Sequence, residues 1–259
     1  LEHPGDGFSF DIYTQIARAL RRSTDALGGV KAKRVIAVGE SQSAIALTTY
    51  YNGVQPLTDA FDGFLVHSRA SVGLPLVGPG KYADLAGGFA SVNTILREDL
   101  DVPALEIQTE GDLTSVLNSV VVRQPDTDVF RLWEVAGTAH ADRFLLGPLA
   151  DATDCGAPVN EAPMHVVVKA SFRQLEEWVR TGEAPPEAPR IATTGTPATI
   201  VRDADGIALG GIRTPPVDVP SEVLTGIPGP NPDLLCILLG STQPLSQARL
   251  AELYDGPAD

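Results

Sequence analysis

Between residues 34 and 43 the sequence reads Arg-Val-Ile-Ala-Val-Gly-Glu-Ser-Gln-Ser. The run from Val35 to Val38 is apolar, rich in β-branched residues and free of polar alternation, which predicts a strand buried on both faces, as in a parallel sheet. The residues from Ser41 to about Asn52 read as a helix. A serine between such a strand and such a helix is typical of a nucleophile elbow, in which a strained turn raises the hydroxyl above the sheet edge.

The neighbours of this serine fit the sterics of that turn. Small residues are needed two positions before and two after a nucleophile, and Gly39 and Ser43 meet that need, although Ser43 stands where Gly is usual. The backbone N–H of Gln42 opens the helix, and we expect it to face a developing oxyanion. We therefore predict Ser41 as the nucleophile, Gln42 as an oxyanion donor and Glu40 as a residue of the substrate pocket.

Outward from this turn, strands alternate with helices, which is the pattern of an α/β fold with a mostly parallel sheet. Beyond Gly182 the chain becomes rich in Pro and Gly. We predict a catalytic portion over residues 1–182 and, over residues 183–259, an extension with a hairpin and a terminal helix that packs on the same domain. The predicted helices are residues 8–27, 164–180 and 246–254, the further strands are residues 61–67, 103–109 and 130–136, and the hairpin is residues 199–209.

A serine nucleophile needs a base and an orienting carboxylate, which in α/β folds of this kind follow in the order Ser, acid, His. The strand at 103–109 runs into Glu110-Gly111-Asp112, and the strand at 130–136 runs into a small-residue loop that carries His140. We predict His140 as the base and Asp112 as its acid, with Glu110 as the alternative because its longer side chain covers the same distance. We expect the carboxylate that does not orient His140 either to be solvated or to hold the loop through backbone N–H groups.

Composition excludes several classes of function. The chain carries 19 Lys and Arg against 33 Asp and Glu, a formal charge of −14 that disfavours nucleic-acid binding. Its apolar stretches are far shorter than the roughly 20 residues that span a bilayer, so we expect a soluble domain with no membrane partner, cytoplasmic or secreted. We find no phosphate loop and no paired-histidine metal motif, and therefore expect no cofactor and no metal.

Three further features have alternative interpretations. His67 ends a predicted strand, and we expect it either to line the acyl pocket or to anchor a loop. The Asp203 to Gly206 stretch lacks the remaining ligands of a calcium loop and is read as a hairpin turn. Cys155 and Cys236 form either one long-range disulfide or two unpaired core thiols, which leaves the compartment open.

Several long motifs resemble the bacterial α/β-hydrolase domain family, an esterase-like group. They are His3-Pro4-Gly5-Asp6, Gly39 to Ser43, Asp62-Gly-Phe-Leu-Val-His-Ser-Arg69, Thr109 to Asp112, Arg131 to Asp142 and the Cys155 to Asn160 segment. The resemblance covers nearly all of the chain. It implies an α/β-hydrolase fold, Ser41 as nucleophile and His140 as base, and hydrolysis of an ester or similar acyl bond in a small molecule.

In this fold the nucleophile follows the fifth strand, and the loop after the third strand supplies an oxyanion N–H. One helix and one strand precede Ser41 here, so we expect the chain to be the C-terminal portion of a hydrolase. The N-terminal strands are then a missing segment or a separate partner chain that pairs with the strand at 35–38, unless the chain is a circular rearrangement of the fold. The leading function is a serine esterase. The alternatives are a non-catalytic binding subunit and another acyl-transfer chemistry on the same fold.

Overall fold

The computed structural model describes residues 5–90, 92–231 and 235–254. These residues divide into two compact units, each built from separate stretches of chain. Unit 1 comprises Leu1–Ile107, Leu117–Leu132 and Lys169–Glu187, and unit 2 comprises Gln108–Val116, Trp133–Val168 and Ala188–Asp259. His3 and Pro4, which belong to one of the motifs above, lie outside the described residues.

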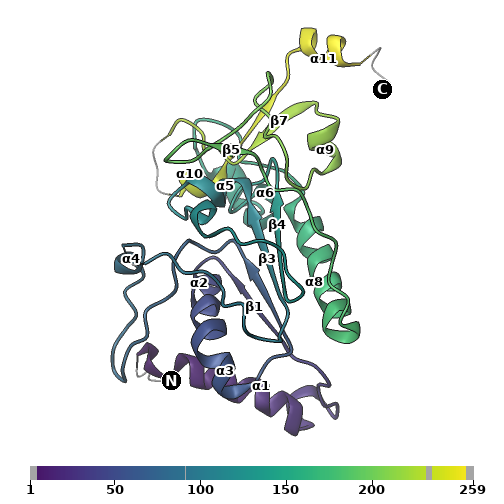
Figure 1. The fold of residues 1–259 in the computed structure, drawn as a ribbon. Helices are drawn as coiled ribbons and strands as arrows, with labels where there is room; N and C mark the ends of the chain where they lie inside the picture. Colours follow the sequence, from purple (N-terminus) through teal and green to yellow (C-terminus); the bar gives the residue numbers. More distant parts are fainter. Residues whose placement is uncertain (1–4, 91, 232–234, 255–259) are drawn as a thin grey trace. The chain divides into compact units, whose positions relative to one another are not determined.

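The predicted α/β fold is confirmed. Its main sheet has the strand order β1-β2-β3-β4, and β1 pairs parallel with β2, as β2 does with β3 (Figure 1). The register places Ile36 beside Gly63 and Phe64 beside Ala104. The strands are β1 (Ile36–Glu40), β2 (Gly63–His67), β3 (Ala104–Thr109) and β4 (Phe130–Val135), each close to its predicted bounds.

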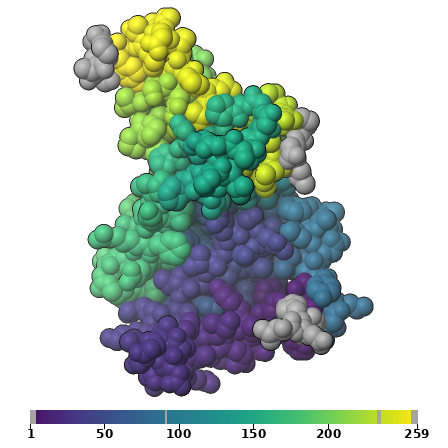
Figure 2. Space-filling view, turned by 180° about the vertical axis from the view of Figure 1, so that it is seen from behind, coloured from purple at the N-terminus to yellow at the C-terminus, as the bar shows by residue number. Residues whose placement is uncertain are grey.

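Helices cover the two faces of β2 in unit 1. Side chains alternate between the faces of a strand, so Phe64 lies on one face and Gly63 on the other. Helix α2 (Gln42–Thr49) packs on β1 and β2, and Phe64 shares a buried cluster with residues of α2. Helix α8 (Met164–Thr181) passes Gly63 so closely that an added Cβ would lie 2.5 Å from a methyl of Val179. Figure 2 shows the green surface of α8 beside the blue surface of the early chain.

An aromatic cluster joins the first helix, α1 (Ser9–Arg22), to this core. The Tyr50 ring lies edge-on to the rings of Tyr13 and Phe61, with centroids 5.5 and 5.3 Å away. Its hydroxyl lies 2.7 Å from the Thr14 hydroxyl, so the one polar atom of this buried ring is hydrogen-bonded. The amphipathic helix predicted from residue 8 is thereby docked on the sheet through its aromatic side chains.

Strand β1 corrects one expectation, since it is buried on one face only. Ala37 is fully buried, whereas Val38 is 42% exposed. The prediction of burial on both faces was wrong because the face that carries Val38 is incompletely covered, as the half-buried Ile36 and the exposed Glu40 on the same face show. Burial raises the pKa of the Tyr13 hydroxyl, and a hydrogen bond from the Val38 backbone opposes that rise. This contact occupies a polar group on a sheet edge, a usual way to protect edge strands.

Two helix boundaries also differ from prediction. Helix α1 ends at Arg22, because Ser23 is extended with φ −103° and ψ 141°, and a separate 3₁₀ turn, η2 (Asp25–Leu27), follows. After Ser41 the helical stretch continues beyond the expected residue 52. It runs from α2 through a π turn, η3 (Tyr50–Val54), into α3 (Gln55–Thr58).

Unit 2 contains two small antiparallel sheets and a disulfide. Strands β5 (Thr193–Thr194) and β6 (Thr199–Ile200) pair, as do β7 (Glu222–Thr225) and β8 (Ser241–Pro244). The hairpin predicted at 199–209 is confirmed: Asp203 N–H donates to the Ile207 carbonyl at 2.9 Å across the turn. Cys155 and Cys236 are joined by a disulfide that sits in a buried apolar cluster with Val159 and Leu239.

The remaining elements are short. They are η1 (Asp6–Phe8), α4 (Leu85–Gly88), α5 (Glu110–Thr114), η4 (Ser119–Val122), α6 (Arg143–Leu146), α7 (Leu149–Ala152), α9 (Pro215–Asp218), α10 (Cys236–Leu239) and α11 (Gln247–Leu253). Within the described ranges, no helix is both long and apolar enough to cross a bilayer.

Candidate active site

Ser41 occupies a strained turn between β1 and α2. Its φ of 56° and ψ of −121° lie in a region that residues with a side chain rarely adopt. Contacts on both sides hold this conformation: the Ser41 N–H donates to the His67 carbonyl at 3.0 Å, and the Ser41 carbonyl accepts the N–H of Ala44 at 3.0 Å. The predicted strand-to-helix turn at this serine is confirmed, and its backbone geometry is that of a nucleophile elbow.

The steric demand inferred for Gly39 is also present. A Cβ added at Gly39 would lie 2.6 Å from the carbonyl oxygen of Ser43, a distance that real Cβ atoms essentially never show. Ser43 itself is exposed, so its side chain is accommodated where Gly is usual. Gln42 is the first residue of α2, and a first-turn N–H has no acceptor within its own helix.

The two predicted pocket residues lie near one another in unit 1. His67 ends β2 and is 7% exposed, and its Nδ1 lies 3.8 Å from Oε1 of Glu40. A cavity of about 230 Å³ opens beside Gln42 and Ser43. Sequence reasoning did not identify its apolar walls, which are formed by Phe10, Ala46, Leu74, Pro75, Leu76 and Val77.

Asp112 and His140 form a buried pair in unit 2. Nδ1 of His140 lies 2.7 Å from Oδ1 of Asp112, and the two residues are 8% and 0% exposed. The second oxygen, Oδ2, accepts the N–H of Thr109 at 2.7 Å, which fixes the carboxylate at the start of α5. A carboxylate is an acceptor, so the geometry favours a proton on Nδ1 and leaves Nε2 as the basic nitrogen.

Glu110, the alternative acid, has other partners. Its Oε1 accepts the Thr225 hydroxyl at 2.8 Å, the Gly226 N–H at 2.9 Å and the Arg202 guanidinium at 2.5 Å. Its Oε2 accepts the N–H of Gly137 at 2.8 Å. Of the two carboxylates considered from the sequence, Asp112 is therefore the one that contacts the histidine.

Hydrogen bonds to Asn160 and to Leu238 hold the loop that carries His140. Nδ2 of Asn160 donates to the carbonyls of Gly137 at 2.8 Å and of Thr225 at 3.1 Å, and the Ala141 N–H donates to the carbonyl of Leu238 at 3.0 Å. Asn160 ends a motif quoted above, but nothing in its spacing indicated this role.

The predicted site residues divide between the two units. Unit 1 contains Ser41, Gln42, Glu40 and His67, and unit 2 contains Asp112 and His140.

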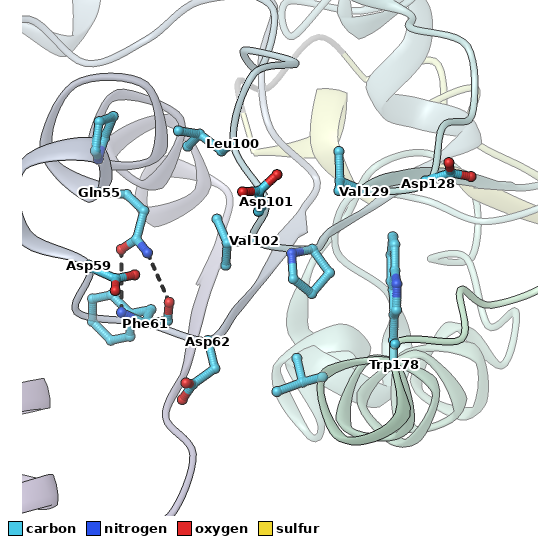
Figure 3. Close-up of a pocket in the computed structure, with 14 residues that line it drawn as sticks. Gln55, Asp59, Phe61, Asp62, Leu100, Asp101, Val102, Asp128, Val129 and Trp178 are labelled. Carbon is cyan, nitrogen blue, oxygen red and sulfur yellow. Dashed lines mark hydrogen bonds between the residues drawn. The ribbon is translucent and has the colours of Figure 1, made fainter.

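A larger pocket lies at the opposite strand ends of unit 1. Its volume is about 560 Å³, and Asp62 and Val102, which line it, precede β2 and β3 at their amino ends (Figure 3). Ser41 follows the carboxyl end of β1, so this pocket is distinct from the turn at Ser41. In the part of the chain that the structure describes, no group of three or more His, Cys, Asp or Glu side chains is arranged to hold a metal ion.

A serine elbow and a buried carboxylate–histidine pair, both following strands of one α/β sheet, define a hydrolase-like class of protein. A family model described as alpha/beta hydrolase domain matches residues 1–259. The chain belongs to this α/β-hydrolase domain family. No curated protein and no solved structure matches the chain.

Proposed function

We propose that the protein is a serine hydrolase that cleaves carboxylic esters, with Ser41 as nucleophile, His140 as base and Asp112 as the residue that orients the base. The observation that carries this proposal is the 2.7 Å contact between Asp112 and Nδ1 of His140 in a chain of the α/β-hydrolase family. The positive φ of Ser41 gives independent support. A strained backbone lowers the stability of the fold, and such conformations are concentrated at functional sites.

In the proposed reaction, Nε2 of His140 takes the proton of the Ser41 hydroxyl while the serine oxygen bonds to the ester carbonyl carbon. The tetrahedral intermediate collapses when the carbon–oxygen bond to the alcohol breaks, and the imidazolium returns its proton to the leaving alkoxide. Water then attacks the acyl-enzyme with the same base, which releases the acid and restores the serine. Asp112 stays ionised throughout and stabilises the imidazolium.

Three residues beside the serine are assigned supporting roles in this proposal. The Gln42 N–H donates to the oxyanion, because it opens the helix that follows the nucleophile. Glu40 and His67 line the substrate pocket next to the turn. The cavity beside Gln42 has apolar walls that include Phe10 and Leu74, and these support an ester with a small apolar group.

A fluorophosphonate probe and p-nitrophenyl acetate test this function together. We expect the probe to label Ser41 and the ester to be hydrolysed, and Ser41→Ala should abolish labelling and lower turnover by several orders of magnitude. Ser23→Ala is the control, because Ser23 is a half-buried serine just after α1 that the proposed site does not include. It should leave both signals unchanged.

A folded protein that neither reacts with the probe nor hydrolyses esters would refute the proposal and favour a non-catalytic binding role. Labelling at Ser41 with product formed only when an alcohol acceptor is added would instead indicate acyl transfer. Product analysis with water and with methanol as acceptors separates these outcomes.

A further inference from the structure

The Glu110 carboxylate collects hydrogen bonds from three distant parts of unit 2. Gly137 lies on the loop that carries His140, whereas Arg202 lies 92 residues and Thr225 115 residues beyond Glu110 in the sequence. Glu110 and its partner Thr225 are buried, and the Arg202 side chain is 18% exposed. One side chain therefore joins the acid-bearing helix, the histidine-bearing loop and the Pro/Gly-rich segment.

The chemistry of these contacts requires a carboxylate. All four partner groups of Glu110 are donors, and an ionised carboxylate accepts through both of its oxygens. A glutamine amide would turn its NH₂ group toward one of these donors. The Arg202 guanidinium supplies the positive charge that a fully buried carboxylate needs, and removal of one partner of such a pair leaves the other uncompensated.

The same network reaches both members of the acid–base pair through the backbone. Glu110 is the first residue of α5, and Asp112 lies in the same turn. Gly137, three residues before His140, is fixed at both of its polar groups, since its N–H binds Glu110 and its carbonyl accepts from Asn160. Gly111 N–H also donates to the Thr138 carbonyl at 3.2 Å.

We propose that Glu110 and Arg202 are positioning residues, through which the segment after residue 187 sets the distance between Asp112 and His140. The inference rests on the proposed function for its kinetic consequence, but the geometry of the pair can be measured without it. A purely structural role would lower the stability of unit 2 and leave the Asp112–His140 hydrogen bond as it is. A positioning role changes that bond in a folded protein.

Arg202→Met removes the charge and the donor, and Arg202→Lys keeps the charge with a shorter reach. Arg249→Met is the matched control, because Arg249 forms an ion pair with Asp205 and Glu252 and is not among the partners of Glu110. Each variant is measured for p-nitrophenyl acetate hydrolysis against pH. The proton between His140 Nδ1 and Asp112 is followed as a downfield resonance in the ¹H NMR spectrum.

With Arg202→Met we expect kcat to fall roughly 10- to 100-fold, as small misplacements of catalytic groups do, with KM changed by less than about twofold. The acid limb of the kcat–pH profile should move, and the downfield resonance should shift or broaden. Arg202→Lys should restore part of each effect. Arg249→Met should match the wild type in all three measurements.

A folded Arg202→Met protein with wild-type kcat, pH profile and resonance would overturn the proposal. If Arg202→Met does not fold, Thr225→Val decides, since it removes a single neutral donor to Glu110. A shifted resonance and lowered kcat in Thr225→Val support positioning, and unchanged values overturn it. If the wild type hydrolyses no ester, the proposed function fails, while the resonance in these variants still tests the positioning role.

Discussion

Replacing Asp112 by Asn changes one oxygen into an NH₂ group at a site where both oxygens are used. Oδ1 contacts Nδ1 of His140 and Oδ2 accepts the Thr109 N–H, both at 2.7 Å. The asparagine has a single acceptor oxygen. If that oxygen keeps the Thr109 N–H, the NH₂ group faces Nδ1, which must then carry a lone pair, and the proton moves to Nε2. The imidazole can no longer accept the serine proton.

The expected loss in turnover is about 10⁴-fold, the cost of the wrong histidine tautomer in the serine-protease triad. This equals roughly 5.5 kcal/mol of transition-state stabilisation, at about 1.36 kcal/mol for each tenfold change in rate. The assay is kcat for p-nitrophenyl acetate at neutral pH, with active sites counted by fluorophosphonate labelling. Glu110→Gln should cost much less, because Glu110 is not the carboxylate bonded to Nδ1. An Asp112→Asn enzyme that keeps more than about a tenth of wild-type turnover, or a larger loss with Glu110→Gln, would refute the assignment.

Four further outcomes are expected. Arg69→Met should lower the free energy of unfolding by about 3–5 kcal/mol in a denaturant titration, because Arg69 is fully buried and the variant removes its buried ion pair with Glu106. Cys155→Ser with Cys236→Ser should cost about 4.5 kcal/mol in the chain-entropy model for a separation of 81 residues, and equal melting temperatures with and without reductant would contradict this. Burial raises the pKa of Glu222 above its ordinary 4.5, and the neighbouring Glu161 carboxylate raises it further. The folded protein favours the protonated side chain, so its stabilising effect is present below the unfolded pKa and is lost as the pH rises through the folded pKa. Glu222→Gln should therefore raise the melting temperature at pH 7 but not at low pH. We also propose that a further polypeptide segment pairs with β1, the end strand of the sheet among the described residues, and hydrogen exchange along β1 would then show stronger protection in the active form than in these 259 residues alone.

The strand-to-helix turn at Ser41 was predictable because its signals are local. An unalternated apolar run, a glycine and a helix start lie within ten residues, and the structure has Ser41 at φ 56° where they meet. The long helix predicted for residues 164–180 is α8 (Met164–Thr181), since its apolar stripe and the following Gly182 are equally local.

What sequence reasoning missed depends on distant partners. The exposure of Val38 depends on how far other elements cover that face of β1, which the residues of β1 do not encode. The pairing of β7 with β8 joins stretches separated by a Pro- and Gly-containing loop. Arg202 contacts Glu110 across 92 residues, and neither residue carries a local pattern that indicates the other. The sequence favoured Asp112 over Glu110, but only the side-chain directions in the structure show that Asp112 contacts His140 and Glu110 does not.

The interleaving of the two units limits how this chain can be cut and recombined. Each unit is assembled from stretches that alternate along the sequence, so no single cut separates one from the other. A gene truncated after residue 187 would encode all stretches of unit 1 but would strip unit 2 of Arg202, Thr225 and Cys236. A shuffled gene that exchanges one contiguous piece would likewise divide both units. We therefore expect neither unit to fold when it is expressed from one contiguous piece of the gene, unlike a domain that occupies a single stretch of sequence.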